Sequence, residues 1–260
     1  MRLQGRVAAV TGGASGIGKG IAYAFAREGA AVAIGDIDEA GASAAATEIA
    51  EETGARTLGM RCDVVSRADV DGLVAAAAEK FGRFDIMVAN AGIAFFKTPL
   101  ETTEEDWDRI MDVNGKGVLL SDQAAARQMI AEGHGGAIVN IASVAALNPA
   151  VGLTAYCASK AAVMHMTKCF ALDLAKYGIR VTSIAPGLVD TPLWGKGMGD
   201  PQVLDHGLRD QFATRVPLGR MATADDIAKM VAFLVSDEGE YLTGHIFVVD
   251  GGQSLAPAAR

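Results

Sequence analysis

The chain contains little cysteine and no long apolar run. Its three cysteines, Cys62, Cys157 and Cys169, are an odd number and lack the Cys-x-x-Cys spacing. We therefore expect reduced thiols, and neither a disulfide framework nor a zinc site. No stretch reaches the ~18 apolar residues of a membrane helix, and the first six residues lead directly into a strand-like segment. These features predict a cytoplasmic protein with no membrane span, membrane partner or signal peptide.

Positive charge, proline and aromatic side chains are also scarce. Lys and Arg number 23 against 31 Asp and Glu, which gives a net charge of −8. This excess of negative charge disfavours nucleic acid and anionic membranes as partners. In contrast, glycine is abundant at 31 residues, and 50% of all residues are hydrophobic. A chain of this length and composition can build a large core with many tight turns.

The first motif combines a strand, a glycine-rich turn and a helix. An apolar run at residues 7–10 predicts a buried strand, and it is followed by Gly12-Gly13-Ala14-Ser15-Gly16-Ile17-Gly18 and a helical pattern. Such a turn lets the backbone approach a ligand, and the N-terminus of the helix attracts a phosphate. A P-loop would need Ser or Thr at position 20, which is Gly20 here. A dinucleotide site instead needs an acidic residue after the second strand.

Asp36 supplies that acidic residue and predicts NAD as the cofactor. It follows the strand-like residues 31–35. A carboxylate here can accept hydrogen bonds from both ribose hydroxyls, and it would repel the 2′-phosphate of NADP. The next residue is Ile37, so no Arg is present at that position to bind the phosphate. The sequence therefore favours NAD over NADP.

Strand and helix patterns alternate through the rest of the chain. Helices are predicted at residues 38–53, after Ser66, after Thr103, around Tyr156 and at residues 227–234, and strands at residues 57–62, 85–89, 136–141, 179–185 and 246–249. Residues 188–212 are predicted to be rich in loops. This alternation indicates a parallel sheet with right-handed crossovers. We expect one domain over residues 1–255 and a C-terminal tail at residues 256–260.

Polar residues recur where the predicted strands end. Thr11-Gly12, Asp36, Asp63 and Asn90 each follow one of the first four strands, and Ser143 follows the fifth. Because the carboxyl ends of parallel strands share one edge of a sheet, we expect these residues to surround one ligand.

Tyr156 and Lys160 lie four residues apart, on one face of a predicted helix. A phenol titrates near pH ~10, so shifting its pKa to about 7 requires roughly 4 kcal/mol. An ammonium ~4 Å away supplies on the order of 4 kcal/mol at an effective dielectric constant of about 20. Taken alone, such a pair is more often an ordinary helix face. We hypothesise a proton-transferring pair because of the residues around it.

Two further helical features are open to more than one interpretation. Asn114-Gly115-Lys116-Gly117 interrupts the helix that begins at Thr103. These residues predict either a close contact between helices or a kink that frees backbone groups and holds a water near Asn114. The helix around Tyr156 is apolar on nearly every side. We therefore expect one side to face the sheet and the other to form a subunit contact.

Taken in order, these motifs resemble the classical short-chain dehydrogenases/reductases over almost the whole chain. The glycine turn is similar to the cofactor loop of that family, and Asp63-Val64 is similar to its adenine contact. Asn90-Ala91-Gly92 matches its fourth strand end, although Ala89 stands where Asn is common. The family's catalytic tetrad corresponds to Asn114, Ser143, Tyr156 and Lys160.

The resemblance implies a Rossmann-like three-layer sandwich, with a seven-stranded, mostly parallel sheet and helices on both faces. It implies hydride transfer, with Tyr156 as the acid or base and Lys160 lowering its pKa and binding the nicotinamide ribose. Ser143 would hold the substrate oxygen, and Asn114 the water of a proton relay. A homotetramer is also implied. The cofactor would be bound by Gly12, Ser15, Gly16, Ile17, Gly18, Asp36, Ile37, Asp63, Val64, Asn90, Ala91, Gly92, Tyr156, Lys160, Pro186, Gly187, Val189 and Thr191.

The expected substrate is a secondary alcohol or its ketone. The predicted pocket wall is largely apolar, with Lys97, Asn148 and His206 as candidate polar contacts and Phe95, Ser143, Ala145, Leu153, Tyr156, Leu193 and Trp194 as the candidate substrate residues. A polyol dehydrogenase and a 3-oxoacyl thioester reductase stay open as alternatives, although the thioester reductases of the family more often use NADPH.

Other classes of protein fit the sequence less well. Extended relatives with the same Tyr/Lys pair usually carry a larger C-terminal domain. A zinc alcohol dehydrogenase would need clustered ligands, whereas the four histidines are dispersed, so no metal is expected. A protein that binds NAD without turnover would be expected to have a broken tetrad.

Overall fold

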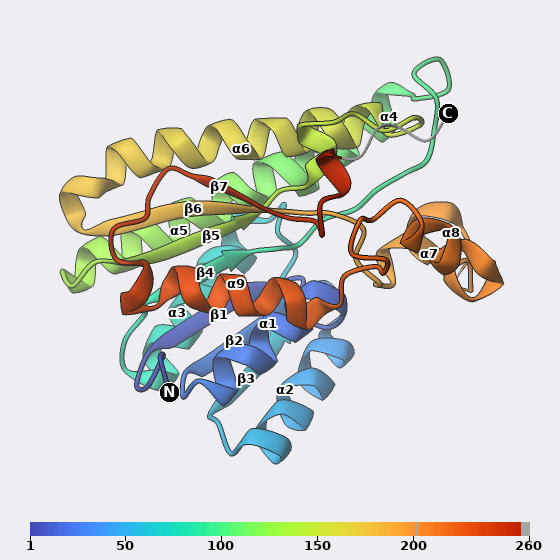
Figure 1. Ribbon diagram of the computed structural model, residues 1–260. Coiled ribbons are helices and arrows are strands. Elements are labelled where there is room, and N and C mark those ends of the chain that lie inside the picture. The colour runs from blue at the N-terminus through green and yellow to red at the C-terminus, as the bar shows by residue number, and fades with distance from the viewer. Residues whose placement is uncertain (201, 256–260) are drawn as a thin grey trace.

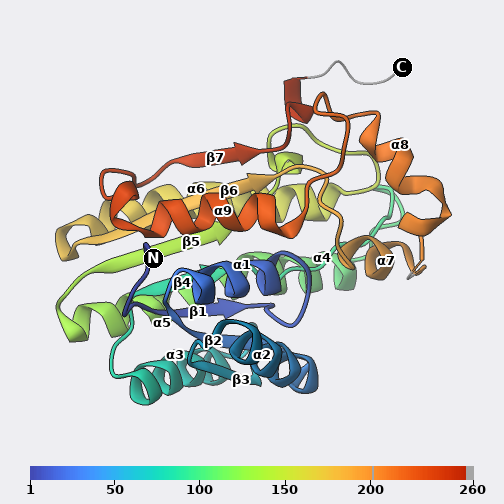
Figure 2. The same cartoon turned by 60° about the horizontal axis from the view of Figure 1, so that its bottom comes forward.

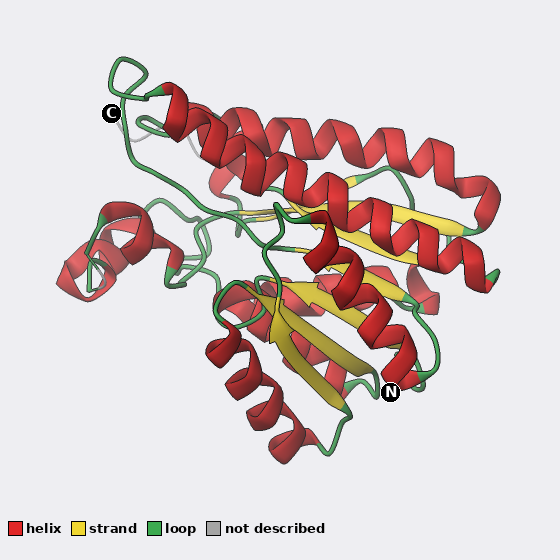
Figure 3. Ribbon diagram, turned by 180° about the vertical axis from the view of Figure 1, so that it is seen from behind, coloured by secondary structure: helices red, strands yellow, loops and turns green. Residues whose placement is uncertain are grey.

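The computed structural model describes residues 1–200 and 202–255, apart from the side chains of Lys196 and His206. The predicted tail at residues 256–260 and the predicted polar contact at His206 therefore lie outside the described part of the chain. Figure 1 shows a twisted central sheet between two layers of helices, and Figure 2 and Figure 3 show the same layers from below and from behind.

All seven strands of the sheet run parallel, in the order β3-β2-β1-β4-β5-β6-β7. The order reverses at β1, where β2 lies on one side and β4 on the other. In such sheets, ligands bind at the carboxyl ends of the strands near this reversal. The strands are β1 (Val7–Thr11), β2 (Ala31–Asp36), β3 (Thr57–Arg61), β4 (Ile86–Ala89), β5 (Gly136–Ile141), β6 (Ile179–Pro186) and β7 (Ile246–Val249).

Helices cover both faces of the sheet, as predicted. One face packs against α1 (Gly16–Arg27), α2 (Glu39–Thr53) and α9 (Ala224–Val235), and the other packs against α3 (Arg67–Phe81), α5 (Gly117–Glu132) and α6 (Thr154–Leu174). An apolar core of buried side chains fills the space between the sheet and each helix layer. None of the described helices has the length and apolar character needed to span a bilayer.

Local capping explains where several helices begin. The Ser66 side chain accepts a hydrogen bond from the Asp69 amide at the start of α3, as the sequence predicts. Thr103 forms a capping box with Asp106 at the start of α4 (Glu104–Met111), and Thr223 forms another at the start of α9.

The predicted loop at residues 188–212 is wrong in part. It contains α7 (Leu193–Met198), a π-helical turn (Leu204–Leu208) and the start of α8 (Arg209–Ala213). These short helices have their own apolar cluster, which includes Leu188 and Phe212. Gly195 and Gly197 within α7 oppose helix formation by about 1 kcal/mol each, and packing against this cluster offsets their effect, whereas Gly199 ends α7 in the left-handed conformation. Figure 1 shows α7 and α8 projecting to one side of the sheet.

Candidate active site

One large cleft lies at the carboxyl ends of the strands. Its volume is about 1920 Å³, and its lining includes residues that follow each strand from β1 to β6. Every predicted cofactor residue except Gly18 lines it, and so do Ser143, Tyr156 and Lys160. The residues that the sequence placed at separate strand ends are therefore gathered around one space.

The glycine-rich loop is shaped by close backbone approaches. Gly12 and Gly16 have φ values of +64° and +56°, which favour glycine. A Cβ on Gly18 would overlap the Gly12 carbonyl oxygen and lie 2.5 Å from the Asn90 side-chain nitrogen. That nitrogen donates to the carbonyls of Thr11 and Gly12, at 2.9 and 3.0 Å. Gly18 thus lies behind the loop and permits its packing, which explains why it does not line the cleft.

The N-terminus of α1 suits a phosphate. Ser15 occupies the N-cap position but makes no side-chain capping hydrogen bond, and the first turn of the helix contains no acidic residue. The first N–H groups of α1 are therefore not occupied by a side-chain cap. They lie at the positive end of the helix dipole, where a phosphate can accept hydrogen bonds from them. These features fit the diphosphate of a dinucleotide.

Asp36 is held in a fixed orientation at the end of β2. Its Oδ2 accepts a hydrogen bond from the Ala14 amide at 3.0 Å, and its Oδ1 accepts one from the Asp38 amide at 3.1 Å. Each oxygen keeps a second lone pair for a ribose hydroxyl. Arg61 lies beside Asp36 in the strand register, but its guanidinium is bound to Asp69 at 2.7 Å. This neighbouring cation is thus already paired, which agrees with a site for NAD without a 2′-phosphate.

Lys160 and Asn114 are both buried, and of the two only Lys160 lines the cleft. The Lys160 ammonium donates to the Ile141 carbonyl at 2.7 Å and lies 5.8 Å from the centroid of the Tyr156 ring. Asn114 Oδ1 accepts from the Ile93 amide at 2.8 Å, and its Nδ2 donates to the Ile93 carbonyl and to Ser159 Oγ. Both polar atoms of the Asn114 side chain are therefore used by the protein, and the water predicted near this residue stays a prediction.

The Tyr156 pKa is raised in the protein alone, chiefly by burial, and the hydrogen bond with Ser143 opposes that rise. Burial also lowers the pKa of Lys160, to about 8. The protein alone therefore does not show a lowered Tyr156 pKa, and the predicted effect of Lys160 stays a prediction for the complex with the cofactor. The physical reason for the raised pKa is that loss of hydration penalises the phenolate by more than the hydrogen bond with Ser143 favours it.

The interruption before α5 shows the predicted backbone irregularity, whereas the close contact of its last glycine is with Val64, a turn residue after β3, and not with a second helix. Residues Asp112–Lys116 form a π-helical turn, and Asn114 lies within it. Gly117 follows, and a Cβ there would approach Val64 Cγ2 to 2.8 Å. A backbone irregularity and a close contact thus occur together, and the contact lies against Val64, one of the predicted cofactor residues in the lining of the cleft.

The substrate region is walled by aromatic and aliphatic side chains. The predicted residues Phe95, Ala145, Leu153, Leu193 and Trp194 all line the cleft. The Trp194 ring packs on Phe212 with a centroid distance of 4.7 Å, and its Nε1 donates to the Val189 carbonyl at 2.8 Å.

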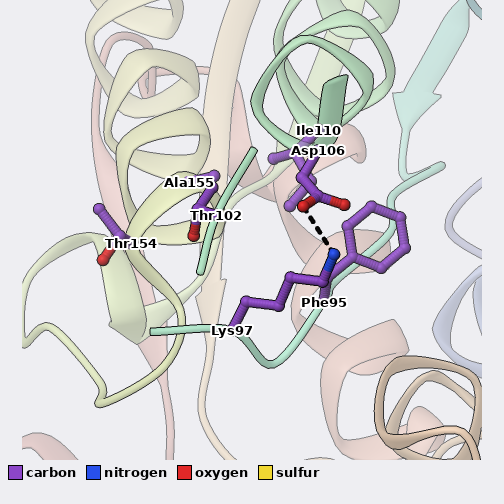
Figure 4. Close-up of a pocket in the computed structure, with 7 residues that line it drawn as sticks. All are labelled: Phe95, Lys97, Thr102, Asp106, Ile110, Thr154 and Ala155. Atoms are coloured by element: carbon purple, nitrogen blue, oxygen red, sulfur yellow. Dashed lines mark hydrogen bonds and ion pairs between the residues drawn. The ribbon is translucent and has the colours of Figure 1, made fainter. Parts of the chain in front are cut away.

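Lys97 does not line this cleft. Figure 4 shows its ammonium directed at Asp106, which it contacts at 2.7 Å beside a separate cavity of about 10 Å³. Asn148 does line the cleft, and its amide donates to the Ser254 carbonyl at 3.0 Å.

Several residues of the cleft were missed from the sequence. Arg109, Arg215, Gln253 and Ser254 line it. Gln253 Oε1 accepts a hydrogen bond from the Leu188 amide at 2.9 Å, so the segment after β7 supports the loop after β6. No local motif marks these residues, because the fold alone brings them to the cleft. Across the described residues, no group of three or more His, Cys, Asp or Glu is placed to hold a metal ion.

Comparisons with known proteins agree with this geometry. A profile of the family described as Enoyl-(Acyl carrier protein) reductase matches residues 12–254. Sorbitol dehydrogenase from Cereibacter sphaeroides is 40% identical over 98% of this chain and 100% of its own. A short-chain type dehydrogenase/reductase from Mycobacterium marinum has a TM-score of 0.89 at 38% identity, covering 98% of this chain and 97% of its own. The 3-ketoacyl-(acyl-carrier-protein) reductase from Brucella melitensis complexed with NADH has a TM-score of 0.88 at 38% identity, covering 97% and 99%. The chain therefore belongs to the short-chain dehydrogenase/reductase family, oxidoreductases that use a nicotinamide cofactor and act on CH–OH groups.

Proposed function

We propose that this protein transfers a hydride between a secondary alcohol, or the corresponding ketone, and NAD. The observation that carries the proposal is the meeting of Ser143, Tyr156 and Lys160 in the same cleft as Asp36. The first three provide a proton path at a substrate oxygen, and Asp36 provides the preference for a free ribose. NADH in the Brucella melitensis reductase supports the same choice of cofactor.

The side chains of the cleft would perform the proton chemistry. Bound NAD supplies the hydride acceptor and a positive ring. In the oxidative direction, the Tyr156 phenolate takes the hydroxyl proton of the substrate, and in reduction the phenol returns it. Ser143 donates a hydrogen bond to the substrate oxygen. Lys160 holds positive charge beside Tyr156 and binds the ribose, and Asn114 fixes the backbone at Ile93 and the Ser159 hydroxyl.

Burial gives Lys160 a defined range of pH in which to act. Its pKa of about 8 means that the ammonium is present at neutral pH and is lost as the pH rises through that value. Positive charge on the bound nicotinamide then adds to that of Lys160 in favouring the phenolate. We infer that the low pKa needed at Tyr156 arises only in the complex with oxidised cofactor.

The apolar wall around Phe95 and Trp194 favours a substrate of modest size with an apolar part. A polyol is the second candidate, because sorbitol dehydrogenase is 40% identical. A 3-oxoacyl thioester is the third, supported by the name of the Brucella melitensis relative. We also propose a cytoplasmic location, which agrees with three cysteines that form no disulfide among the described residues.

A substrate panel tests this function. Purified protein is incubated with NAD⁺ or NADP⁺ and a series of secondary alcohols, polyols and 3-hydroxyacyl thioesters, and formation of the reduced cofactor is followed by absorbance. We expect turnover of a secondary alcohol with NAD⁺.

The Tyr156→Phe substitution tests the acid–base role of the phenol. We expect kcat to fall about 10²–10⁴-fold. Cofactor binding should persist in this variant, as measured by calorimetry. Substantial turnover by Tyr156→Phe would exclude the proposed acid–base role.

A further inference from the structure

A buried polar cluster lies where α5, β5 and α6 meet. Asp122 on α5, Asn140 on β5 and Thr167 on α6 are all fully buried. None of them lines the cleft, and the proposed mechanism uses none of them. The three elements that they join are nevertheless those that hold the tetrad. The π-helical turn with Asn114 precedes α5, Ser143 follows β5, and α6 carries Tyr156 and Lys160.

The orientation of the Asn140 amide is set by its neighbours. Its Nδ2 donates to Asp122 Oδ2 at 2.9 Å and to Thr167 Oγ1 at 3.1 Å. Thr167 uses its own hydroxyl hydrogen on the Val163 carbonyl at 2.9 Å. Thr167 therefore acts as an acceptor toward Asn140, and the NH₂ group, not the amide oxygen, must face it.

Two oxygens of this cluster have no partner. Among the buried side chains that the structure describes, Asp122 Oδ1 and Asn140 Oδ1 are the atoms without a hydrogen bond. Two acceptors cannot satisfy each other, and each unsatisfied buried group costs about 1–3 kcal/mol. These oxygens belong to two planar groups that already share one hydrogen bond. A single proton on Asp122 Oδ1 would join them, and it would close a ring of two hydrogen bonds between an acid and an amide.

We propose that Asp122 is held as a neutral carboxylic acid that donates its proton to Asn140 Oδ1 and so links α5, β5 and α6 beneath the active site. Asp122 is then a positioning residue, which acts on the tetrad through Asn140 and Thr167. The positioning role rests on the proposed function, whereas the protonation state of Asp122 does not.

The electrostatic surroundings agree with a neutral acid. Burial raises the pKa of Asp122 to about 7, against the opposing effect of the hydrogen bond from Asn140. The other buried charged side chain on these three elements is Lys160 on α6, whose ammonium lines the cleft, is bound to the Ile141 carbonyl and does not contribute to the Asp122 pKa. Asp71 on α3, Arg127 on α5, and Lys168 and Asp173 on α6 are exposed to solvent. Two further carboxylates are half-buried and have other partners: Asp69 on α3 binds Arg61, and Glu132 on α5 accepts from the Phe84 amide. None of these groups contributes to the Asp122 pKa.

The Asp122→Asn substitution provides the central test. The new amide can donate permanently to Asn140 Oδ1, so it imitates the neutral acid but does not titrate. An unfolded Asp loses its proton near pH ~3.9. A folded Asp122 keeps its proton to a higher pH, so the stability of the natural protein falls as pH rises between these two values. The unfolding constant of the natural protein relative to that of Asp122→Asn should therefore rise about tenfold per pH unit between these values, and about fiftyfold from pH 5 to pH 7, because the rise levels off as folded Asp122 titrates near pH 7.

Urea unfolding at several pH values measures this ratio. Asp173→Asn is the matched control, because Asp173 is exposed on α6 and undergoes the same chemical change. The ratio of the unfolding constant of the natural protein to that of Asp173→Asn should not show this rise with pH. Asp122→Leu removes the donor as well as the charge and should be less stable than Asp122→Asn at every pH. In assays of hydride transfer, Asp122→Asn should keep the kcat of the natural protein, whereas Asp122→Leu should have a lower kcat.

Infrared spectroscopy gives an independent measurement on the folded protein. At pH 6, the natural protein should show a protonated carboxyl stretch that is absent from Asp122→Asn. Absence of this band, or a stability ratio that does not change with pH, would show an ionised Asp122 and overturn the proposal. If the band is present and kcat is equal in all variants, the acid–amide ring stands but its positioning role is refuted.

Discussion

At the scale of single residues, the main electrostatic feature of the cleft is that burial shifts the pKa of both Tyr156 and Lys160, its proposed proton-transferring pair. Lys160 is 3% exposed, and its ammonium has a backbone carbonyl as its partner. Such a group is destabilising in its charged form, because burial removes hydration that one hydrogen bond does not replace. The rest of the fold therefore has to stabilise the Lys160 ammonium in its position near Tyr156, where the proposed proton transfer requires positive charge. The protein without cofactor favours neutral Tyr156, and in the proposed mechanism a positive nicotinamide would provide the missing stabilisation of the phenolate.

Asp36 should decide between the two nicotinamide cofactors. Replacing it with Ala removes one or two charge-assisted hydrogen bonds to the ribose, each worth about 1.5–3 kcal/mol. We expect kcat/KM for NAD to fall about ten- to hundredfold or more, with a smaller change for NADP. The ratio of the two values, measured with one substrate, is the test.

Asp38→Ala is the matched control for this substitution. Asp38 is exposed and caps α2, where its side chain accepts from the Gly41 amide. Its removal deletes the same charge nearby and should lower stability by about 1 kcal/mol while leaving the cofactor ratio unchanged. Equal ratios in Asp36→Ala and the natural protein would refute the ribose contact.

At the scale of secondary structure, the glycine inside the π-helical turn and the glycine directly after it have different surroundings. A Cβ on Gly117 would meet Val64 Cγ2 at 2.8 Å, whereas one on Gly115 would meet nothing closer than Met111 Cε at 3.8 Å. Gly117→Ala should therefore displace Val64, lower stability by about 1–3 kcal/mol and weaken NAD binding. Gly115→Ala should be neutral or stabilising by up to about 1 kcal/mol.

Thermal unfolding with and without NAD distinguishes these two outcomes. If Gly117→Ala binds NAD as tightly as Gly115→Ala does, the contact with Val64 has no role in the cofactor site. If Gly115→Ala is the more damaging variant, the π-helical turn itself depends on glycine at that position.

The elements that the sequence predicted well are those whose signals are local. The buried strands and the caps at Ser66, Thr103 and Thr223 follow from neighbouring residues. The helices at residues 193–213 were missed because their glycines oppose helix formation and their stability comes from contacts with Phe212 and its cluster. The orientation of Lys97 toward Asp106 and the approach of Gln253 to the cleft depend on tertiary contacts that no local pattern encodes.

At the scale of the whole molecule, α6 has one face that a single chain does not cover. Its inner face is buried, but Ala161, His165, Cys169 and Leu172 follow one another along an exposed outer face, and Leu172 is 82% exposed. The sequence predicted burial of this helix on more than one side. Exposure of this outer face is the reason to expect a second copy of the chain against it.

We propose that the protein is a homotetramer in which this outer face of α6 is an interface. Light scattering after gel filtration should give four times the 26.8 kDa chain mass. Burying the Leu172 side chain of each chain in the interface should stabilise the assembly by about 1.5–3 kcal/mol. Leu172→Asp replaces this contribution with a charge, so it should reduce the mass of the assembly. Leu100→Asp introduces the same charge at a loop residue that is 99% exposed, and it should leave the mass unchanged. A monomeric natural protein would contradict the tetramer. A Leu172→Asp variant that keeps the mass of the natural assembly would instead place the interface elsewhere, since a buried aspartate at a two-fold interface would face its own copy.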